Sequence, residues 1–378
     1  MQRIYDVGPI SAENENVAAS TLLYAADKTS SLKELREVKG KLYCSYEVAA
    51  EGGRYNVAFV DLTEKLEEMR KVLAAWKEKD AYIVKEYSCG NEMDTWPLRC
   101  DDSDLTKGLV GFLSNTSTGN TWSDEYLCVN ATVKNGEPVA EGGLTFKGPG
   151  AGAEWPVGKK GQNVPYHFAN ERFTLVATVS IHEVPKENSS PIPLMGVKLS
   201  ETDSKLVFGL SYTHDKKWRV AFNGSFRVPS RRVFEWKPNT KYHLALRMGS
   251  DGGLMVYVDG ETIYDSEFDY RREGDEDKNE LFDEKLRRLM RSHSISHMYI
   301  GGDSERASDN IHVTVSNVLL YSRSFSNAKL TALMKNNAFG TPEAKLPATK
   351  VAAQPTIVSQ PSDKPANEPA PRHEVQQE

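Results

Sequence analysis

The sequence has few cysteines and no long hydrophobic run, and each shortage excludes a class of protein. None of its 4 cysteines forms a C-x-x-C pair, so a zinc-binding knuckle is not expected. No apolar stretch approaches the roughly 20 residues that a membrane-spanning helix needs. The first residues, Met1 to Asp6, contain no apolar region of the kind that a signal peptide requires. We therefore expect neither a structural zinc site nor a transmembrane helix.

A strong charge of one sign is also missing. The 47 basic residues stand against 53 acidic residues, and the formal net charge is only -6. This balance provides no overall basic field for nucleic acid or acidic lipid, so neither is expected as a partner.

Motifs for metal or nucleophilic chemistry are scarce too, since no G-x-S-x-G, Walker loop or H-E-x-x-H sequence occurs. His293 and His297 have the spacing of a helical metal site. They precede a predicted strand, however, in which residues four apart are roughly 13 Å distant. Asp275 begins a sequence that mimics a calcium loop, but Glu280 stands at the sixth position, where glycine is needed. We therefore expect no metal ion and no cofactor.

The cysteines differ in their sequence context. Cys44 lies in an alternating, strand-like run and is expected to be a buried free thiol. Cys89, Cys100 and Cys128 flank a loop-rich stretch that could hold one disulfide. A bond between Cys89 and Cys100 would close a short loop, but the connectivity cannot be read from the sequence.

Glycosylation sequons of the type N-x-S/T are unusually close together in this chain. Each alone is a weak signal, but together, beside turn-forming residues, they favour a secreted and glycosylated domain. They lie at Asn115, Asn130, Asn188 and Asn223.

The first 60 residues are predicted to form one small antiparallel sheet. Its expected strands are Ser20–Tyr24, Lys41–Val48 and Tyr55–Leu62, with a hairpin turn at Glu51–Arg54. A single sheet has no second layer against which to bury its apolar face. Residues 1–60 therefore indicate a remnant of a larger β structure.

Residues 61–80 are predicted to form a helix that links two domains. Asp61 can cap it, and Glu64 completes a capping box. An apolar stripe at helical spacing indicates core packing. Its members are Leu62, Leu66, Met69, Leu73 and Trp76.

Residues 81–107 are irregular, and residues 108–340 carry many short strand patterns separated by turn signals, which indicates a sandwich or barrel. A charged insertion at 265–291 contains a short amphipathic helix over Asn279–Arg291. Residues 341–378 are rich in Pro, Ala, Ser and Gln and are expected to be a disordered tail.

Two sets of motifs carry a resemblance to known families. Tyr242–Arg247, Met255–Glu261 and Ile300–Gly302 resemble strands of the laminin-G and concanavalin A-like jelly roll. The eleven residues from Val313 resemble the hallmark VTVxNVxLYNR of the trypanosome trans-sialidase superfamily, with serine in place of its last asparagine. These residues are Val313, Thr314, Val315, Ser316, Asn317, Val318, Leu319, Leu320, Tyr321, Ser322 and Arg323.

The resemblance implies a mostly β chain. It would contain the last part of a six-bladed sialidase propeller, one linking α-helix and a concanavalin A-like sandwich. In the family, a propeller tyrosine is the nucleophile that attacks sialic acid. Here Ala19 stands where that tyrosine would be, in a run that aligns with Ala-Tyr-Ser-Ser-Val-Leu-Tyr. Glu47 matches a glutamate that steadies a family arginine, and the family's arginines, aspartate and partner glutamate would lie upstream of Met1. No catalytic residue is therefore expected in this chain.

By this resemblance we expect an inactive surface protein that acts in host-cell adhesion, invasion or immune evasion. Val313–Arg323 would be its adhesive segment, and its partners would be host-cell surface or cytoskeletal proteins or glycans. We expect a cell-surface or secreted location, although the chain ends at Glu378 without the family's lipid-anchor signal.

Two alternatives remain open at this point. One is a fragment of an active exo-α-sialidase or trans-sialidase. The other is a stand-alone glycan-binding module with loop aromatics as candidate contacts. These aromatics are Trp122, Trp155, Tyr166 and Trp236.

Overall fold

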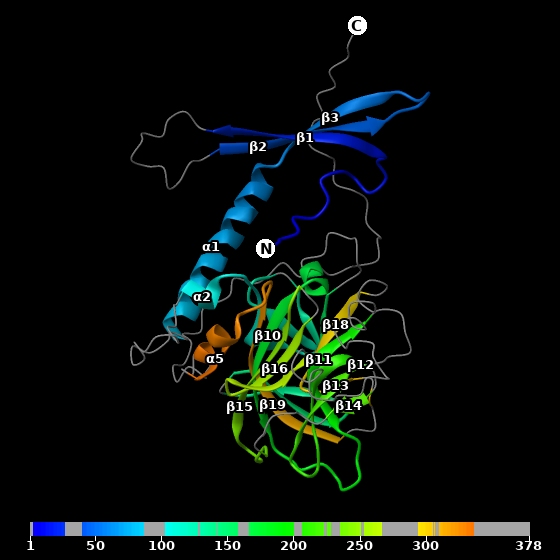
Figure 1. Ribbon diagram of the computed structural model, residues 1–378. Helices are drawn as coiled ribbons and strands as arrows, with labels where there is room; N and C mark the ends of the chain where they lie inside the picture. The colour runs from blue at the N-terminus through cyan, green and yellow to red at the C-terminus, as the bar shows by residue number, and fades with distance from the viewer. Residues whose placement is uncertain are drawn as a thin grey trace, which may run out of the picture. The chain divides into compact units, whose positions relative to one another are not determined.

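The computed structural model describes residues 3–26, 40–86, 103–127, 129–140, 142–157, 166–199, 206–222, 225–227, 235–250, 253–266, 294–304, 306 and 310–335. These residues divide into two compact units, drawn in Figure 1. The first comprises residues 3–5 and 76–335, and the second comprises residues 6–75. Several predicted features lie outside the described residues: the helix over Asn279–Arg291, the tail 341–378, Cys89, Cys100, Cys128 and Asn223.

The second unit is built on the predicted antiparallel sheet, with strand order β1-β2-β3. The strands are β1 (Val17–Ala26), β2 (Gly40–Ala49) and β3 (Tyr55–Asp61). One face packs a small apolar cluster around Cys44, Tyr46 and Leu62, and Cys44 is the buried free thiol that the sequence predicts.

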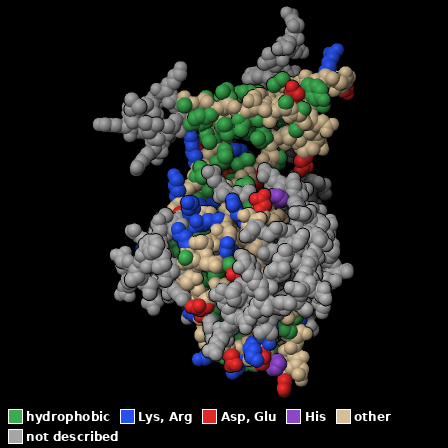
Figure 2. Space-filling view, in the orientation of Figure 1, with side chains coloured by type: hydrophobic (Ala, Val, Ile, Leu, Met, Phe, Trp, Pro, Cys, Tyr) green, Lys and Arg blue, Asp and Glu red, His purple; other side chains and the backbone are tan. Residues whose placement is uncertain are grey.

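The other face of this sheet is open. Tyr55, Val57 and Phe59 alternate along β3 and are 60–68% exposed, and Phe59 stacks on Tyr43 of β2 with ring centroids 5.2 Å apart. Figure 2 shows hydrophobic side chains gathered over this sheet. The prediction that the sheet does not bury its apolar surface by itself is therefore confirmed.

Helix α1 (Thr63–Glu86) begins two residues after the predicted start at residue 61 and ends six residues after the expected end at residue 80. The backbone N–H of Thr63 donates to Asp61 Oδ1 at 2.8 Å and so satisfies one of the unpaired groups of the first turn. The predicted stripe is wrong at Leu73, which is 51% exposed, whereas Val72 is buried. The packed side of the helix is therefore turned by one residue relative to the predicted stripe at this point.

The first unit is an antiparallel β-sandwich. Its strands are β4 (Leu109–Thr118), β5 (Thr121–Asp124), β6 (Ala131–Lys134), β7 (Gly136–Pro138), β8 (Leu144–Pro149), β9 (Gly152–Pro156), β10 (Phe173–Ile181), β11 (Ile192–Leu199), β12 (Leu206–Tyr212), β13 (Trp218–Phe222), β14 (Ser225–Arg227), β15 (Lys241–Met248), β16 (Leu254–Val258), β17 (Glu261–Asp265), β18 (Ile295–Ile300) and β19 (Asn310–Tyr321). Its short helices are α2 (Ser103–Thr106), the 3-10 helix η1 (His167–Asn170) and α5 (Asn327–Lys335). One continuous strand path, β14-β13-β12-β11-β18-β9-β6-β5-β4-β19-β10-β15-β16-β17, forms both layers, and β8 and β7 extend it from β19.

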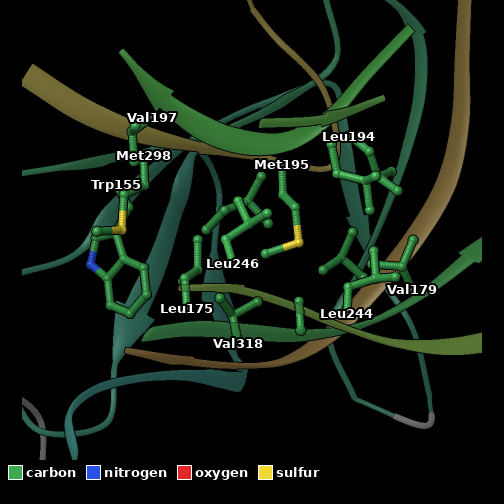
Figure 3. Close-up of a cluster of buried hydrophobic side chains, with 14 of the residues drawn as sticks. Trp155, Leu175, Val179, Leu194, Met195, Val197, Leu244, Leu246, Met298 and Val318 are labelled. Carbon is green, nitrogen blue, oxygen red and sulfur yellow. The ribbon is translucent and has the colours of Figure 1, made fainter. Parts of the chain in front are cut away.

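The main core lies between the two layers. Figure 3 shows side chains from β11 and β18 opposite side chains from β10, β15 and β19. Met195 and Met298 stand for the first group, and Leu175, Leu246 and Val318 stand for the second; all five are buried. These interdigitated apolar side chains make the unit a two-layer sandwich, which confirms the predicted fold class.

A second apolar cluster covers part of the outer face of the β10-β15-β19 layer. Val176, Ala245 and Leu319 point outward from these strands and pack beneath the helices. Ile83 near the end of α1 and Leu330 of α5 belong to the same cluster, and both are fully buried. The end of α1 therefore packs on the sandwich within the first unit.

Candidate functional site

Ala19, at the position where the resemblance would place a nucleophile, lies in a β-bulge between β1 and β2. Val17 pairs with Val48 and Ser20 pairs with Tyr46, so Ala18 and Ala19 together face the single residue Glu47. Bulges re-aim side chains and are frequent beside active sites. The structure thus brings the two predicted residues, Ala19 and Glu47, into one place. The exposed methyl group of Ala19 has no lone pair with which to attack a sugar carbon.

The surroundings of Glu47 contain no catalytic partner among the described residues. Glu47 is partly exposed, and no Lys, Arg or His of the described ranges forms an ion pair with it. Across the strand pair its neighbour is Val57. Of the nearby tyrosines, Tyr43 stacks on Phe59, and the Tyr46 hydroxyl donates to Glu15 at 3.1 Å.

The predicted adhesive segment, Val313–Arg323, occupies most of β19 and the turn that follows it. From Val313 to Ser322 only the Thr314 side chain is more than 8% exposed, and Arg323 is partly exposed. β19 lies between β10 on one side and β8 and β4 on the other. In the folded protein this segment is thus a central strand of the sandwich.

Asn317 sits where β19 changes its neighbour. Residues up to Val315 pair with β8, and residues from Val318 pair with β4. On the opposite side, the register with β10 shifts between Val176 and Thr178, so an extra residue of β19 is accommodated there. Asn317 has φ of 51°, a left-handed conformation that asparagine tolerates better than most residues. Asn317 of the hallmark thus forms the bulge at which β19 passes from pairing with β8 to pairing with β4.

The last residues of the hallmark bind the end of β19 to the segment that precedes β4. The buried hydroxyl of Tyr321 donates to the carbonyl of Leu105 at 2.9 Å, and the N–H of Ser322 donates to the carbonyl of Gly108 at 2.7 Å. The Arg323 guanidinium lies over the Phe325 ring, 4.0 Å from its centroid. These contacts give the hallmark a structural role in the sandwich.

The four aromatic residues considered as glycan contacts are all buried, so this prediction is wrong for the folded protein. Their polar groups face inward in three of the cases. The indole N–H groups of Trp122 and Trp155 donate to the carbonyls of Ser114 and Val129, and the Tyr166 hydroxyl donates to Asp124. Large aromatic side chains in a sandwich fill the core because they bury the most apolar area. The residues concerned are Trp122, Trp155, Tyr166 and Trp236.

Three of the four predicted glycosylation positions lie on the surface. Asn115, Asn130 and Asn188 are exposed. The side-chain oxygen of Asn130 accepts a hydrogen bond from the N–H of Asp124 at 2.9 Å. This contact uses the amide oxygen, so the nitrogen that carries a glycan is not occupied by it.

No cluster of metal-ligating side chains occurs within the described ranges. None of the helices there is long and apolar enough to cross a membrane.

Sequence reasoning missed a row of basic residues at one end of the sandwich. Lys107 lies two residues before β4, Arg323 lies two residues after β19, Arg172 directly precedes β10, and Arg247 is the penultimate residue of β15. The four strands are neighbours in the order β4-β19-β10-β15, and the antiparallel pairing brings these ends together. The sequence signal that could have revealed these four basic residues is that each of them flanks or ends a predicted strand. We call these residues the cation row.

Comparison with known proteins assigns relatives to nearly the whole length of the chain. The family model described as "Trans-sialidase, C-terminal domain" matches residues 105–328, and the model described as "BNR repeat-like domain" matches residues 1–47. A Trypanosoma cruzi protein named "Sialidase" is 34% identical over 347 residues, which cover 90% of this chain and 26% of the relative. Another, "Sialidase 85-1.1", is 30% identical over 80% of this chain and 36% of the relative.

Solved structures of Trypanosoma rangeli sialidase share the fold. One has a TM-score of 0.65 at 33% identity and covers 89% of this chain and 47% of the sialidase chain. Another, in complex with sialic acid, has a TM-score of 0.66 at 34% identity and covers 90% and 48% of the two chains. This chain thus spans about half the length of the solved sialidases and a smaller share of the two curated relatives.

Proposed function

Because the chain belongs to the trypanosome trans-sialidase superfamily, we propose that it acts as a surface glycoprotein without catalytic activity, whose lectin-like sandwich contacts host cells. The observation that carries this proposal is that Ala19 faces Glu47 at the bulge between β1 and β2. The family's covalent chemistry needs an oxygen nucleophile at that position, and alanine has none.

The absence of catalysis is tested by sialic acid release. Purified protein is incubated with a fluorogenic sialoside, and in parallel with a sialylated donor and an acceptor sugar. We expect no release and no transfer above the level of heat-inactivated protein. Release of sialic acid at an enzymatic rate would instead support the alternative, a part of an active sialidase. That reading is favoured only by the relatives' names and the sialic acid complex.

The contact with host cells is tested separately, with labelled protein and cultured mammalian cells. Saturable binding that a molar excess of unlabelled protein abolishes supports the proposed adhesion. Binding that does not saturate contradicts it. The Ala19→Tyr variant serves as a matched control, because Ala19 lies in the second unit and is not part of the sandwich.

The role of Val313–Arg323 in adhesion follows from its burial. In the folded protein the segment offers a partner only its partly exposed side chains, Thr314 and Arg323. We therefore propose that any adhesive contact here uses these side chains together with their neighbours on adjacent strands. A synthetic peptide of the segment should then compete poorly with folded protein for cell binding. Equal competition by the peptide would show that the isolated segment is sufficient.

Glycosylation at the exposed sequons fits the proposed surface location. Asn115, Asn130 and Asn188 are accessible in the folded domain. Digestion of the natural protein with an N-glycanase should lower its mass, and peptide mapping should recover aspartate at these positions. Unchanged mass after digestion would contradict this part of the proposal.

The second unit is proposed to be the last part of a BNR-repeat propeller. The match of residues 1–47 to the BNR repeat-like model supports this domain assignment. The exposed Tyr55, Val57 and Phe59 support it as well, because propeller sheets bury both faces against neighbouring blades. Co-expression with the upstream blades of a relative should protect these residues from solvent, and unchanged amide exchange in β3 would contradict the assignment.

A further inference from the structure

We propose that the cation row of the sandwich is a binding site for linear sulfated polysaccharides. The row comprises Lys107, Arg323, Arg172 and Arg247, one residue from each of four adjacent strand ends. The inference names a ligand class for the adhesion proposed above and rests on that proposal only for its biological role.

The spacing of the row follows from sheet geometry. Neighbouring strands lie about 4.8 Å apart, so four adjacent strand ends spread their side chains over roughly 14 Å. Local contacts confirm the order of the row. The Arg323 side chain lies against Gly108, beside Lys107, and the Arg323 carbonyl accepts a hydrogen bond from Thr174 at 2.9 Å. Thr174 pairs directly with Arg247.

Three of the four cations of this row have no ion-pair partner among the described residues. Within the described residues, no carboxylate lies within salt-bridge distance of Lys107, Arg172 or Arg247. The hydrogen bonds of Arg247 go to neutral groups of Ser324, Asn327 and Met255.

Arg172 and Lys107 are exposed, and the other two members of the row are partly exposed. One acidic residue, Glu171, is exposed beside Arg172. The row thus gathers four cations in a chain whose formal net charge is -6.

The geometry points to a ligand whose charges repeat along a line. A single terminal carboxylate, as in sialic acid, can contact one or two of these cations at a time. A sulfated polysaccharide carries permanent anionic groups along its length and can engage all four. Arginine is suited to this because its planar guanidinium donates two parallel hydrogen bonds to an oxyanion. Three of the four members are arginines.

The test compares two double variants of the full chain. Lys107→Gln with Arg172→Gln removes the two exposed members of the row. Lys147→Gln with Lys186→Gln removes two exposed cations far from it, since Lys147 is in β8 and Lys186 follows the other end of β10. Both variants change the net charge equally, and circular dichroism verifies that both are folded. The probes are heparin, chemically desulfated heparin and double-stranded DNA.

We expect the row variant to bind heparin about tenfold more weakly than the parent, and the control variant to bind within about twofold of it. Binding should fall as salt rises, because the sites are solvent-exposed. Desulfated heparin should not bind. The proposal is overturned by equal heparin affinity of the two variants, or by DNA that binds as tightly as heparin.

Cell binding separates this proposal from the proposed adhesion. Heparin binding without any binding to host cells supports the site and contradicts adhesion. Cell binding without heparin binding contradicts the site and supports adhesion through another surface.

Discussion

Asp80 of α1 binds the guanidinium of Arg3 with both carboxylate oxygens, at 2.6 and 3.0 Å. The third guanidinium nitrogen donates to the carbonyl of Leu109 at 2.9 Å, and the group lies 3.8 Å from the centroid of the Tyr126 ring. The Tyr126 hydroxyl donates to Asp80 at 2.7 Å, and burial raises its pKa, so it keeps the proton that this bond needs. Arg3 thus ties the first residues of the chain to α1 and β4 within one unit.

Replacement of Arg3 by alanine should destabilise the sandwich unit by about 2 kcal/mol, because Asp80 loses a bidentate partner while it stays partly buried. The measurement is chemical denaturation followed by tryptophan fluorescence. Arg172→Ala is the matched control, since that exposed arginine has no ion-pair partner among the described residues. Equal effects of the two substitutions would show that the bidentate contact contributes nothing.

Asn317 tests the structural role of the hallmark. Its φ of 51° disfavours β-branched residues, so Asn317→Val should cost about 2 kcal/mol of unfolding free energy. Asn317→Gly should cost less, because glycine adopts this conformation without strain. Thermal unfolding of the two variants checks the order. If valine is tolerated as well as glycine, the left-handed bulge is not needed at the point where β19 changes partner.

Glu125 should make the sandwich sensitive to acid. Burial raises the pKa of Glu125, but the charge of Lys79, 2.6 Å away, and hydrogen bonds from Lys79, Ser114 and Thr116 more than offset this, and the pKa lies below its ordinary 4.5. The resulting stabilisation is present above pH 4.5 and is lost as the pH falls through the lowered pKa. The free energy of unfolding, measured with urea at pH 7 and pH 3.5, should therefore fall less between these pH values in Glu125→Gln than in the parent protein. An identical pH dependence would contradict this assignment.

Removal of the hydroxyl group should change the stability of the protein differently at two buried tyrosines, Tyr299 and Tyr126. The Tyr299 hydroxyl is fully buried, has no hydrogen-bond partner within the described ranges, and burial raises its pKa well above the usual value. Tyr299→Phe should therefore be neutral or stabilise the protein by up to about 1 kcal/mol. Tyr126→Phe should destabilise by about 1 to 2 kcal/mol, because Asp80 loses a donor. The comparison is made by thermal unfolding, and a loss of stability in Tyr299→Phe would reveal a partner for that hydroxyl.

The open face of the second unit should bind hydrophobic probes. Replacing Val57 by threonine and Phe59 by serine removes two of its most exposed apolar side chains and should lower the fluorescence of a bound hydrophobic dye. The control is Leu73→Ser, an exposed apolar residue on α1 instead of β3. Dye fluorescence that falls equally in both would place the dye elsewhere.

Much of the fold could be predicted because it depends on local patterns. The three strands of the second unit, the start of α1 just after its capping residue Asp61, and the alternation of β19 follow from periodicity and turn residues. The resemblance of short motifs gave Ala19 and Glu47 separate roles, and only the strand register shows that the two residues lie opposite each other.

Other features depend on contacts between distant parts of the chain and could not be predicted from local patterns. The indole of Trp155 looks the same in the sequence whether it faces a ligand or the core, and only the second layer decides that it is buried. Lys107 and Arg247 belong to one cation row because β19 and β10 lie between β4 and β15, an order that the sequence does not express. The exposure of Leu73 likewise depends on which neighbours α1 meets.

The central place of β19 has a consequence for folding kinetics. Its Tyr321 bonds to Leu105, 216 residues earlier in the chain, and its neighbours β4, β8 and β10 all come from the first half of the unit. Pairings of such long sequence separation fold slowly, because the intervening loop must be closed first. During synthesis, β4 and β10 leave the ribosome long before their shared partner, with edges that can pair wrongly. The hallmark strand is thus the last piece needed to close the sheet, and the nascent domain depends on protection of these edges until that strand has been made.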